Sequence, residues 1–331
     1  MNTRISRGGQ AFDAAGSAGL GFLTSNLALI DPVVTRPLSA QTYERDIDIR
    51  YGGGFGPSFI NAWSANYAAP GGGALGLQGT NNTDVPLVQV DLQEGTWKSY
   101  LWTQGFSISY FDLAKIEFAS RNGMQPPINF QDLYANAIQA TFDKAMDRVT
   151  YLGWAGQPGL VNNPAVAATT VVGGVWSAAT PAVILAAVNT AIGSVIANSV
   201  YDLAEGMPNR MLVPWSVFAF LSQPMTTAGS ISTIKYIEDS NIAATSGAGA
   251  GFRILPIPDP WVATQGVGAT KRIVVYRKDT QAVDLFVPQP VTQIMTLPTL
   301  SKGGSYETMY GANIGQLRWK RPQTALYVDG V

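Results

Sequence analysis

The sequence predicts an α+β fold in which one long helix separates an extended β region from a compact mixed region. Three observations lead to this prediction. Apolar side chains recur along residues 130–152 at the spacing of a single helix face. Several stretches on either side alternate apolar and polar residues, as half-buried strands do. Further along, Thr180 followed by Pro181 is a helix start signal.

The composition indicates a surface that meets other chains. Of 331 residues, 46% are hydrophobic and only 13% are charged, whereas an ordinary soluble domain carries about 25% charged residues. Interface cores are depleted of charge in this way. The net charge of −1 gives no argument for attraction to nucleic acid or to a membrane surface.

The chain contains no Cys and no His. Their absence excludes disulfides, Cys- or His-based metal and haem sites, and every Ser-His or Cys-His catalytic pair. Carboxylate or Lys chemistry stays open in principle. We therefore expect no enzyme activity, no catalytic residues, no cofactor and no metal site.

The first hundred residues predict an arm and a long β ribbon. Residues 1–40 are rich in small residues and weakly patterned, so we expect an arm that a partner holds in place. Tyr43–Tyr51 is predicted as a strand. After the glycine-rich stretch Gly52–Asn82, the chain is predicted to return as strands over residues 88–110. An isolated ribbon is marginal in water, which favours a neighbouring subunit beneath it.

The central helix is predicted over Phe130–Leu152, with Asn129 as its cap and Gly153 as its stop. At 1.5 Å per residue it is roughly 34 Å long. Phe142 belongs to its apolar face, and Asp143 and Asp147 are expected on its solvated face. Tyr110–Arg121 predicts a shorter helix before it.

The second half predicts a buried α/β region. No charged residue occurs from Val149 through Tyr201, which indicates burial. The apolar run Ala182–Val200 is interpreted as a core helix in preference to a membrane span, because polar residues interrupt it and no Lys or Arg flanks it. The remaining elements expected are the strand and helix of Arg210–Leu221, a helix over Ile231–Asp239, and strands over Phe252–Ile257, Arg272–Arg277, Val283–Leu297, Tyr306–Trp319 and the closing residues up to Val331.

Several local patterns are compatible with chemistry but have simpler structural interpretations. Gly71–Gly76 matches GxGxxG, yet it lacks the preceding strand and following helix of a dinucleotide site. Asp46 and Asp48 are expected on a polar strand face, although two carboxylates at this spacing could also act as an acid–base pair. The basic clusters are predicted to be salt-bridged surface, with phosphate binding as the alternative; they comprise Lys271, Arg272, Arg277, Lys278, Arg318, Lys320 and Arg321.

The order of these elements resembles that of tailed-bacteriophage major capsid proteins, the Hong Kong 97-like fold that encapsulin shells share. The pieces that carry the resemblance are Tyr151-Leu152-Gly153 at the end of the long helix, the turn Gly159–Pro164 that follows, and the closing Pro322–Val331 strand. The resemblance covers nearly the whole chain and depends on order and spacing more than on any single motif.

The resemblance implies four segments. Residues 1–42 would be the N-terminal arm, and residues 43–110 the extended E-loop with its base strands. The P-domain, with its spine helix over 130–152, would comprise residues 111–164 and 279–312. The α/β A-domain would comprise residues 165–278 and 313–331.

The function implied is self-assembly, as pentamers and hexamers, into the icosahedral shell that encloses double-stranded DNA in the virion. The resemblance also implies assembly in the host bacterial cytoplasm, with portal and scaffolding proteins as partners. It implies non-specific contact with the packaged DNA and no contact with a membrane. An encapsulin-like nanocompartment is the alternative; an enzyme and another virion component fit the pattern less well. The inter-subunit contact candidates are Arg4, Arg7, Trp63, Tyr67, Trp97 and Trp102.

Overall fold

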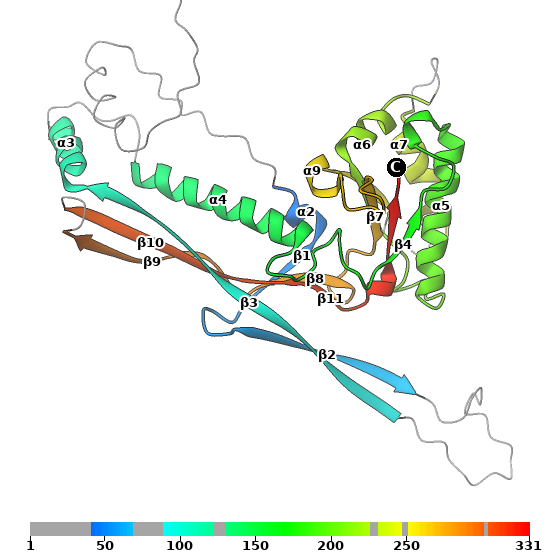
Figure 1. Ribbon diagram of the computed structural model, residues 1–331, viewed down its shortest axis with the longest axis horizontal. Coiled ribbons are helices and arrows are strands. Elements are labelled where there is room, and N and C mark those ends of the chain that lie inside the picture. Colours follow the sequence, from blue (N-terminus) through cyan, green and yellow to red (C-terminus); the bar gives the residue numbers. More distant parts are fainter. Residues whose placement is uncertain (1–40, 69–88, 122–129, 226–230, 247–250, 301–303) are drawn as a thin grey trace, which may run out of the picture. The chain divides into compact units, whose positions relative to one another are not determined.

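The computed structural model describes residues 41–68, 89–121, 130–225, 231–246, 251–300 and 304–331. Within these ranges it has the predicted α+β architecture (Figure 1). Three predictions lie outside the described residues. These are the arm up to residue 40, the GxGxxG match at Gly71–Gly76 and the cap at Asn129.

The elements of the first half alternate between short pieces and two long ones. The longest strand is β3, Gln89–Ser109, and the longest helix is α4, Phe130–Leu152, with the bounds that the sequence predicted. The helix predicted over Tyr110–Arg121 is present as α3. The other elements are α2 (Tyr43–Asp46), β1 (Asp48–Tyr51), β2 (Phe59–Ala68), β4 (Ala167–Thr170), η1 (Trp176–Ala178) and α5 (Pro181–Asn198).

The second half follows the predicted order, with two of the expected strands each divided in two. Tyr306–Trp319 was expected as one strand and Val283–Leu297 as another, but each is interrupted by a single residue. The elements are β5 (Arg210–Pro214), α6 (Trp215–Leu221), α7 (Thr233–Ser240), α8 (Ile242–Thr245), β6 (Arg253–Ile257), α9 (Asp259–Val262), β7 (Arg272–Tyr276), β8 (Val283–Val287), β9 (Gln289–Thr299), β10 (Ser305–Gly315), β11 (Leu317–Trp319), η3 (Pro322–Thr324) and β12 (Ala325–Asp329).

The chain divides into two compact units. Of the described residues, those within 103–141 and 292–311 belong to the first, and those within 41–102, 142–291 and 312–331 belong to the second. The four segments implied by the resemblance have other boundaries than these two units, and they stay a prediction.

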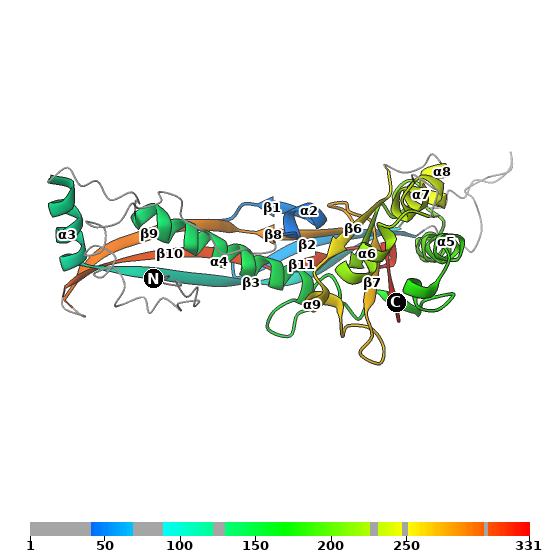
Figure 2. The same ribbon diagram turned by 90° about the horizontal axis from the view of Figure 1, so that it is seen from above.

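Part of the second unit is built around a five-stranded mixed sheet. Its strand order is β4-β12-β7-β5-β6. Strands β7 and β12 are buried along their whole length because helices cover them. Figure 2 shows α5, α7 and α8 together on one side of this sheet, where their apolar residues form one core with Ile273 and Val275. The closing strand is thus an inner strand of the sheet, as expected from its apolar sequence.

Helix α5 begins at Pro181, as predicted, and is long and apolar enough by composition to cross a membrane. In this fold its buried residues pack on the sheet: Ile184, Val188, Ile192 and Val195 belong to the same core as β7. This packing agrees with the interpretation as a core helix. The Thr180 side chain makes no capping hydrogen bond, so that part of the prediction is wrong.

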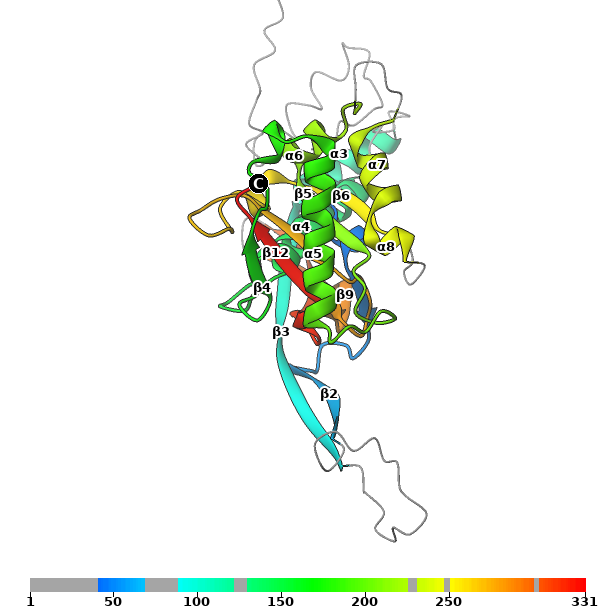
Figure 3. The same cartoon turned by 90° about the vertical axis from the view of Figure 1, so that its right-hand side faces the viewer.

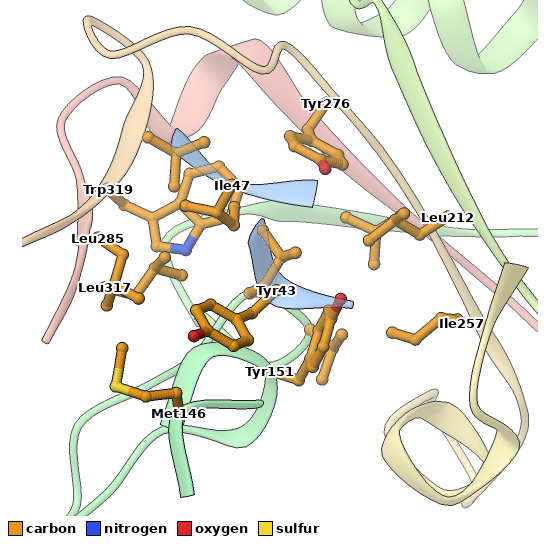
Figure 4. Packing of buried hydrophobic residues seen from close by; sticks show 14 of the residues in the cluster. Tyr43, Ile47, Met146, Tyr151, Leu212, Ile257, Tyr276, Leu285, Leu317 and Trp319 are labelled. Carbon is orange, nitrogen blue, oxygen red and sulfur yellow. The ribbon is translucent and has the colours of Figure 1, made fainter. Parts of the chain in front are cut away.

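A second core lies between the end of α4, the opposite face of the same sheet and a three-stranded sheet of order β1-β8-β11. Figure 4 shows Tyr43, Met146, Tyr151 and Tyr276 converging in it. Phe142 also belongs to this core and is only 5% exposed. The helix face predicted from sequence spacing is therefore the buried one.

The prediction of one strand over Tyr43–Tyr51 is wrong. Residues Tyr43–Asp46 form a helical turn, and only Asp48–Tyr51 is a strand. Strand β1 pairs in parallel with β8 and takes no part in the ribbon. In the ribbon the antiparallel partner of β3 is β2, which lies inside the glycine-rich stretch Gly52–Asn82, and β3 pairs with β10 on its other side.

The prediction of burial from Val149 through Tyr201 holds only in part. All four residues of β4 are exposed, and so are Trp154, Val172, Val175 and Val200. The absence of charge therefore marks both core and exposed apolar surface, which is the pattern expected where other chains bind.

The turn after α4 explains the motif Gly159–Pro164. Gly153 ends the helix with a φ of +78°, a conformation that glycine adopts readily. Only glycine fits at this position, because a side chain would collide with the Gln157 carbonyl. The Asn162 side chain accepts from the Gly159 N–H at 2.6 Å and donates to the Leu152 carbonyl at 2.9 Å. The Tyr327 hydroxyl of β12 accepts from the Asn163 N–H and donates to the Leu160 carbonyl. The motif thus ties the helix end to the closing strand.

In the first unit, aromatic residues carry the packing. Phe106 of β3 stacks on Tyr134 of α4, with ring centroids 4.7 Å apart, and lies 6.2 Å from the ring of Tyr310 on β10. The β3 backbone approaches β10 so closely at Gly105 that a side chain there would meet the Thr308 carbonyl. The alternation predicted for this part of β3 therefore has a structural basis.

Candidate assembly surface

Strand β2 and residues 89–98 of β3 form a two-stranded ribbon, which projects from the rest of the second unit (Figure 3). Cross-strand partners in an antiparallel pair lie on the same side. The register pairs Phe59 with Lys98, Trp63 with Glu94, and Ala65 with Leu92. All of these residues therefore share one face of the ribbon.

This face is largely apolar, and none of the described residues covers it. We call it the ribbon contact face; its large apolar members are Phe59, Trp63, Val90 and Leu92. Each is more than half exposed, and Trp63 is 66% exposed. Charge is confined to Glu94, which accepts a hydrogen bond from Asn61 at 2.5 Å, and to Lys98 at the base.

The opposite face of the ribbon is polar or small along its length and is anchored at its base. Ser64 pairs with Gln93 there, and Ala62 with Gly95. At the base the paired residues are Ile60, which is buried, and Trp97, whose indole lies over Gly95. The guanidinium of Arg318 lies 5.9 Å from the Trp97 ring centroid. The two faces thus differ: one contacts the chain's own body and the other contacts nothing in the described residues.

Two buried amides of the 312–316 segment hold the two legs of the ribbon. Asn313 donates to the backbone carbonyls of Gly54 and Pro57, at 3.3 and 3.0 Å, on the way into β2. Gln316 accepts from the Lys98 N–H at 3.3 Å and donates to the Tyr100 hydroxyl at 3.2 Å on β3. Three of these four hydrogen bonds involve backbone groups of the ribbon legs, so they fix the base of the ribbon largely independently of its own side chains.

The predicted contact residues fall into three groups. Arg4 and Arg7 lie outside the described residues, and Tyr67 is placed on β2 by its backbone alone. Trp63 is on the ribbon contact face. Trp97 and Trp102 are half-buried in their own subunit, where the Trp102 ring packs edge-on against Phe142 with centroids 5.3 Å apart. The contact role of all six stays a prediction.

Phe59 and Leu92 were not singled out from the sequence, although both lie on the ribbon contact face. The signal that could have found them is the alternation Phe59, Asn61, Trp63, Ala65, which places every second residue on one side. The surrounding glycines concealed it.

The basic clusters are salt-bridged, as predicted, but two of their members are buried and not on the surface. Arg272 donates to both carboxylate oxygens of Asp329, at 2.7 and 2.9 Å. Arg318 does the same with Asp284, which is fully buried and also accepts from Lys320 at 2.9 Å. Because these cations are already occupied, they are poor candidates for phosphate contacts.

The aspartates predicted to be solvated are also buried in two cases. Asp46 has no exposed surface and accepts from Arg45 and from the Tyr151 hydroxyl. Asp147 is 1% exposed and accepts from the backbone N–H groups of Thr42 and Tyr43, at 3.1 and 3.0 Å. These contacts tie the segment after residue 40 to α4.

Burial raises the pKa of the Asp147 carboxyl to about 6. The two backbone N–H donors oppose the shift, while the nearby carboxylates of Asp46 and Asp143 add to it. One oxygen of Asp147 has no hydrogen-bond partner among the described residues, which agrees with a costly buried charge. The site joins the segment after residue 40 to α4. Within the described ranges, no group of three or more carboxylates could hold a metal ion.

Solved structures show where this fold occurs. The capsid of Myoviridae phage XM1 matches with a TM-score of 0.68 and 14% identity, covering 93% of this chain and 98% of that chain. The mature capsid of bacteriophage PhiM1 matches with a TM-score of 0.53 and 14% identity, covering 92% and 91%. A virus-like particle from Pyrococcus furiosus matches with a TM-score of 0.50 and 11% identity, covering 95% and 97%. The comparison with curated proteins finds no match.

At these identities the structural matches establish the fold, which is that of the tailed-phage capsid subunits. The family follows from the sequence itself: the model of the family described as major capsid protein matches residues 73–331, so the chain belongs to the major capsid protein family. It is a shell-forming structural protein of a phage capsid, and its place is the virion.

Proposed function

We propose that pentamers and hexamers of this chain close into an icosahedral shell around double-stranded DNA, and that the chain has no catalytic activity. The observation that carries the proposal is the uncovered ribbon contact face. Aromatic side chains bury roughly 150–250 Å² each, and apolar burial contributes about 25 cal/mol per Å². Covering Trp63 alone would therefore stabilise a contact by on the order of 3 kcal/mol.

The two-faced ribbon suits contact between identical subunits. An apolar ribbon of one copy that meets a different surface of the next copy makes a head-to-tail contact, and such contacts generate rings when the rotation closes. Five or six copies per ring are the units of an icosahedral shell. The buried amides at the ribbon base support this proposal, because a ribbon held at a fixed angle gives the same contact in every copy.

The proposal includes portal and scaffolding proteins as assembly partners, non-specific contact with the packaged DNA, and assembly in the host bacterial cytoplasm. Membership of the major capsid protein family supports these elements. The net charge of −1 agrees with a shell that has no strong affinity for DNA as a whole.

A protein nanocompartment that packages cargo protein is the second candidate, and the likeness to the virus-like particle from Pyrococcus furiosus favours it. The contents of purified particles separate the two. Absorbance spectra and nuclease-protected DNA identify a genome shell, whereas a co-purifying cargo protein without DNA identifies a compartment.

The test shortens the ribbon. Residues 61–96 are replaced by Asn-Gly, which joins the cross-strand partners Ile60 and Trp97 by a two-residue hairpin turn. The base contacts of Ile60 and Trp97 remain, so the variant should fold with wild-type circular dichroism. Negative-stain electron microscopy and sedimentation velocity should show shells for the wild type and none for the variant.

Both the wild type and the variant are expressed alone and with scaffolding candidates. Normal shells from the shortened chain would remove the ribbon from the assembly contact. A wild-type chain that forms no shell under either condition would overturn the proposed function itself.

A further inference from the structure

Two consecutive residues after α5 have a backbone conformation that side chains rarely adopt. Val200 has φ of +55° and Tyr201 has φ of +58°. Left-handed backbone is uncommon for any residue with a side chain, and for a β-branched or bulky residue it is an outlier. Glycine is the usual residue at such a helix end. The chain instead has valine and tyrosine there.

The loop that contains them is held from both sides. The N–H of Tyr201 donates to the Ile196 carbonyl at 2.9 Å, and the N–H of Gly206 donates to the Asp202 carbonyl at 2.8 Å. The Asp202 carboxylate accepts from the N–H groups of Ala204 and Glu205, both at 3.0 Å. A side chain at Gly206 would collide with the Asp202 carbonyl. The conformation is therefore imposed by the surrounding contacts.

The loop presents apolar side chains to solvent. Val200 is 86% exposed, Tyr201 is 73% exposed and Leu203 is 49% exposed. We call these three residues the α5 knob. The strained backbone lowers the stability of the isolated subunit, and the exposed apolar side chains contribute little to that stability. A contact with another surface would explain both the strained backbone and the exposed apolar side chains. The rigid loop holds these side chains in one fixed position before a partner binds.

We infer that the α5 knob is a contact surface for a second copy of this chain. The inference rests on the shell-forming function, since each copy in a closed shell is surrounded by identical copies. The charges agree with it. Asp202 is engaged within the loop and Glu205 pairs with Arg321, so the knob itself offers apolar groups. A chain with only 13% charged residues and an uncovered apolar ribbon face offers surfaces of the same chemistry.

The first experiment replaces each strained residue by glycine in the full-length chain. Val200→Gly and Tyr201→Gly relax the backbone and remove the apolar group together. The Tm of the unassembled subunit should stay the same or rise by up to about 4 °C. The yield of closed shells, counted by electron microscopy, should fall by about tenfold or more, which corresponds to about 1.4 kcal/mol of lost contact free energy.

Ala155 and Ala269 supply the matched controls. Both are exposed and have φ of +52° and +57°, but neither carries a large apolar side chain. Ala155→Gly and Ala269→Gly should show the same unchanged or raised Tm with wild-type shell yield. A fall in shell yield for these controls would assign the effect to the backbone and overturn the contact role of the knob side chains.

The second experiment identifies the partner. A benzoylphenylalanine photocrosslinker replaces Tyr201, and irradiated particles are analysed by gel and by mass spectrometry. Covalent dimers of this chain are expected. Crosslinks to a different protein, or none to a second copy, would overturn the inference, as would wild-type shell yield from both glycine variants. Failure of the wild type to form shells would instead count against the proposed function.

Discussion

The five-stranded sheet and the ribbon use similar residues in opposite ways. In the sheet, β7 and β12 are buried on both faces, and the charge of Arg272 is matched inside the protein by Asp329. In the ribbon, Phe59, Trp63 and Leu92 point to solvent. The difference teaches that apolar strand residues of this chain are of two kinds. One kind is buried within the subunit, and the other is exposed and, by our proposal, is buried against a neighbouring subunit.

The sheet and the ribbon also differ in how their charges are balanced, because the ribbon beyond its base carries acidic residues without basic ones. The segment from Tyr51 to Trp97 has three acidic residues, Asp84, Asp91 and Glu94, and no Lys or Arg. Like charges oppose edge-to-edge pairing of one ribbon with another. We therefore expect the ribbon to dock on the body of a neighbouring subunit and not on a second ribbon.

The largest expected effect is at Phe142, in the core that α4 shares with α2 and β8. Phe142→Asp removes a buried ring and places an unpaired charge where only 5% of the residue is exposed. We expect a loss of more than about 4 kcal/mol and therefore no soluble folded protein. Expression yield and circular dichroism measure it, with Phe142→Leu as the folded control. A wild-type yield of Phe142→Asp would refute the core assignment.

The buried pair of Arg318 and Asp284 comes next. Arg318→Met removes the bidentate donor to Asp284. The buried Asp284 carboxylate then has only Lys320 and the more distant Arg50 as ion-pair partners among the described residues. Breaking one side of a buried pair costs about 3–5 kcal/mol, and we expect the lower end because Lys320 remains. Urea denaturation of the unassembled subunit measures it.

Arg321→Met is the matched control for that measurement, because Arg321 pairs with Glu205 at the exposed surface. Surface pairs contribute at most about 1 kcal/mol. Equal losses for the two variants would show that burial of the Asp284 pair does not matter, contrary to the structure.

The third effect depends on pH. Asp147 has a pKa of about 6 in the folded chain, above the ordinary value of 3.8 for an aspartate. The folded state therefore binds the proton more tightly, so the ionised group lowers stability as the pH rises from about 4 to above 6. Asp147→Asn should raise the free energy of unfolding by up to roughly 3 kcal/mol at pH 8, and by little at pH 4.

Denaturant titrations of unassembled subunits at both pH values measure this difference. Asp132→Asn, at an exposed position of the same helix, should change stability by less than about 0.5 kcal/mol at either pH. A constant offset between Asp147→Asn and wild type across the pH range would contradict the assignment.

The predictable part of the fold is local. The bounds of α4 and the burial of Phe142 follow from a spacing that the helix itself imposes on neighbouring residues. The closing strand is similar, since its apolar run suffices to bury it. The end of α4 could also be predicted from the sequence, because Gly153 adopts a positive φ that other residues rarely adopt.

The unpredictable part depends on distant partners. Asp46 looks like a solvated strand residue until Tyr151, about a hundred positions later, donates to it. Strand β1 alternates as a ribbon strand would, but its partner β8 begins at Val283. Strand pairing over such separations leaves no trace in local periodicity. The ribbon contact face was missed in part for another reason: none of the described residues buries it, so burial within the subunit cannot mark it.

The smallest expected effect on folding, at Trp63, separates the two kinds of apolar residue most directly. Trp63→Asp acts on a 66% exposed side chain, so the free energy of unfolding should change by less than about 0.5 kcal/mol. Shell yield should nevertheless collapse, because a charge would enter an apolar contact with a neighbour. Ser64→Asp introduces the same charge on the opposite face of the ribbon and should assemble normally. Equal assembly of both variants would show that the ribbon contact face is not the face that docks, whereas unfolding of Trp63→Asp would place its partner inside the subunit after all.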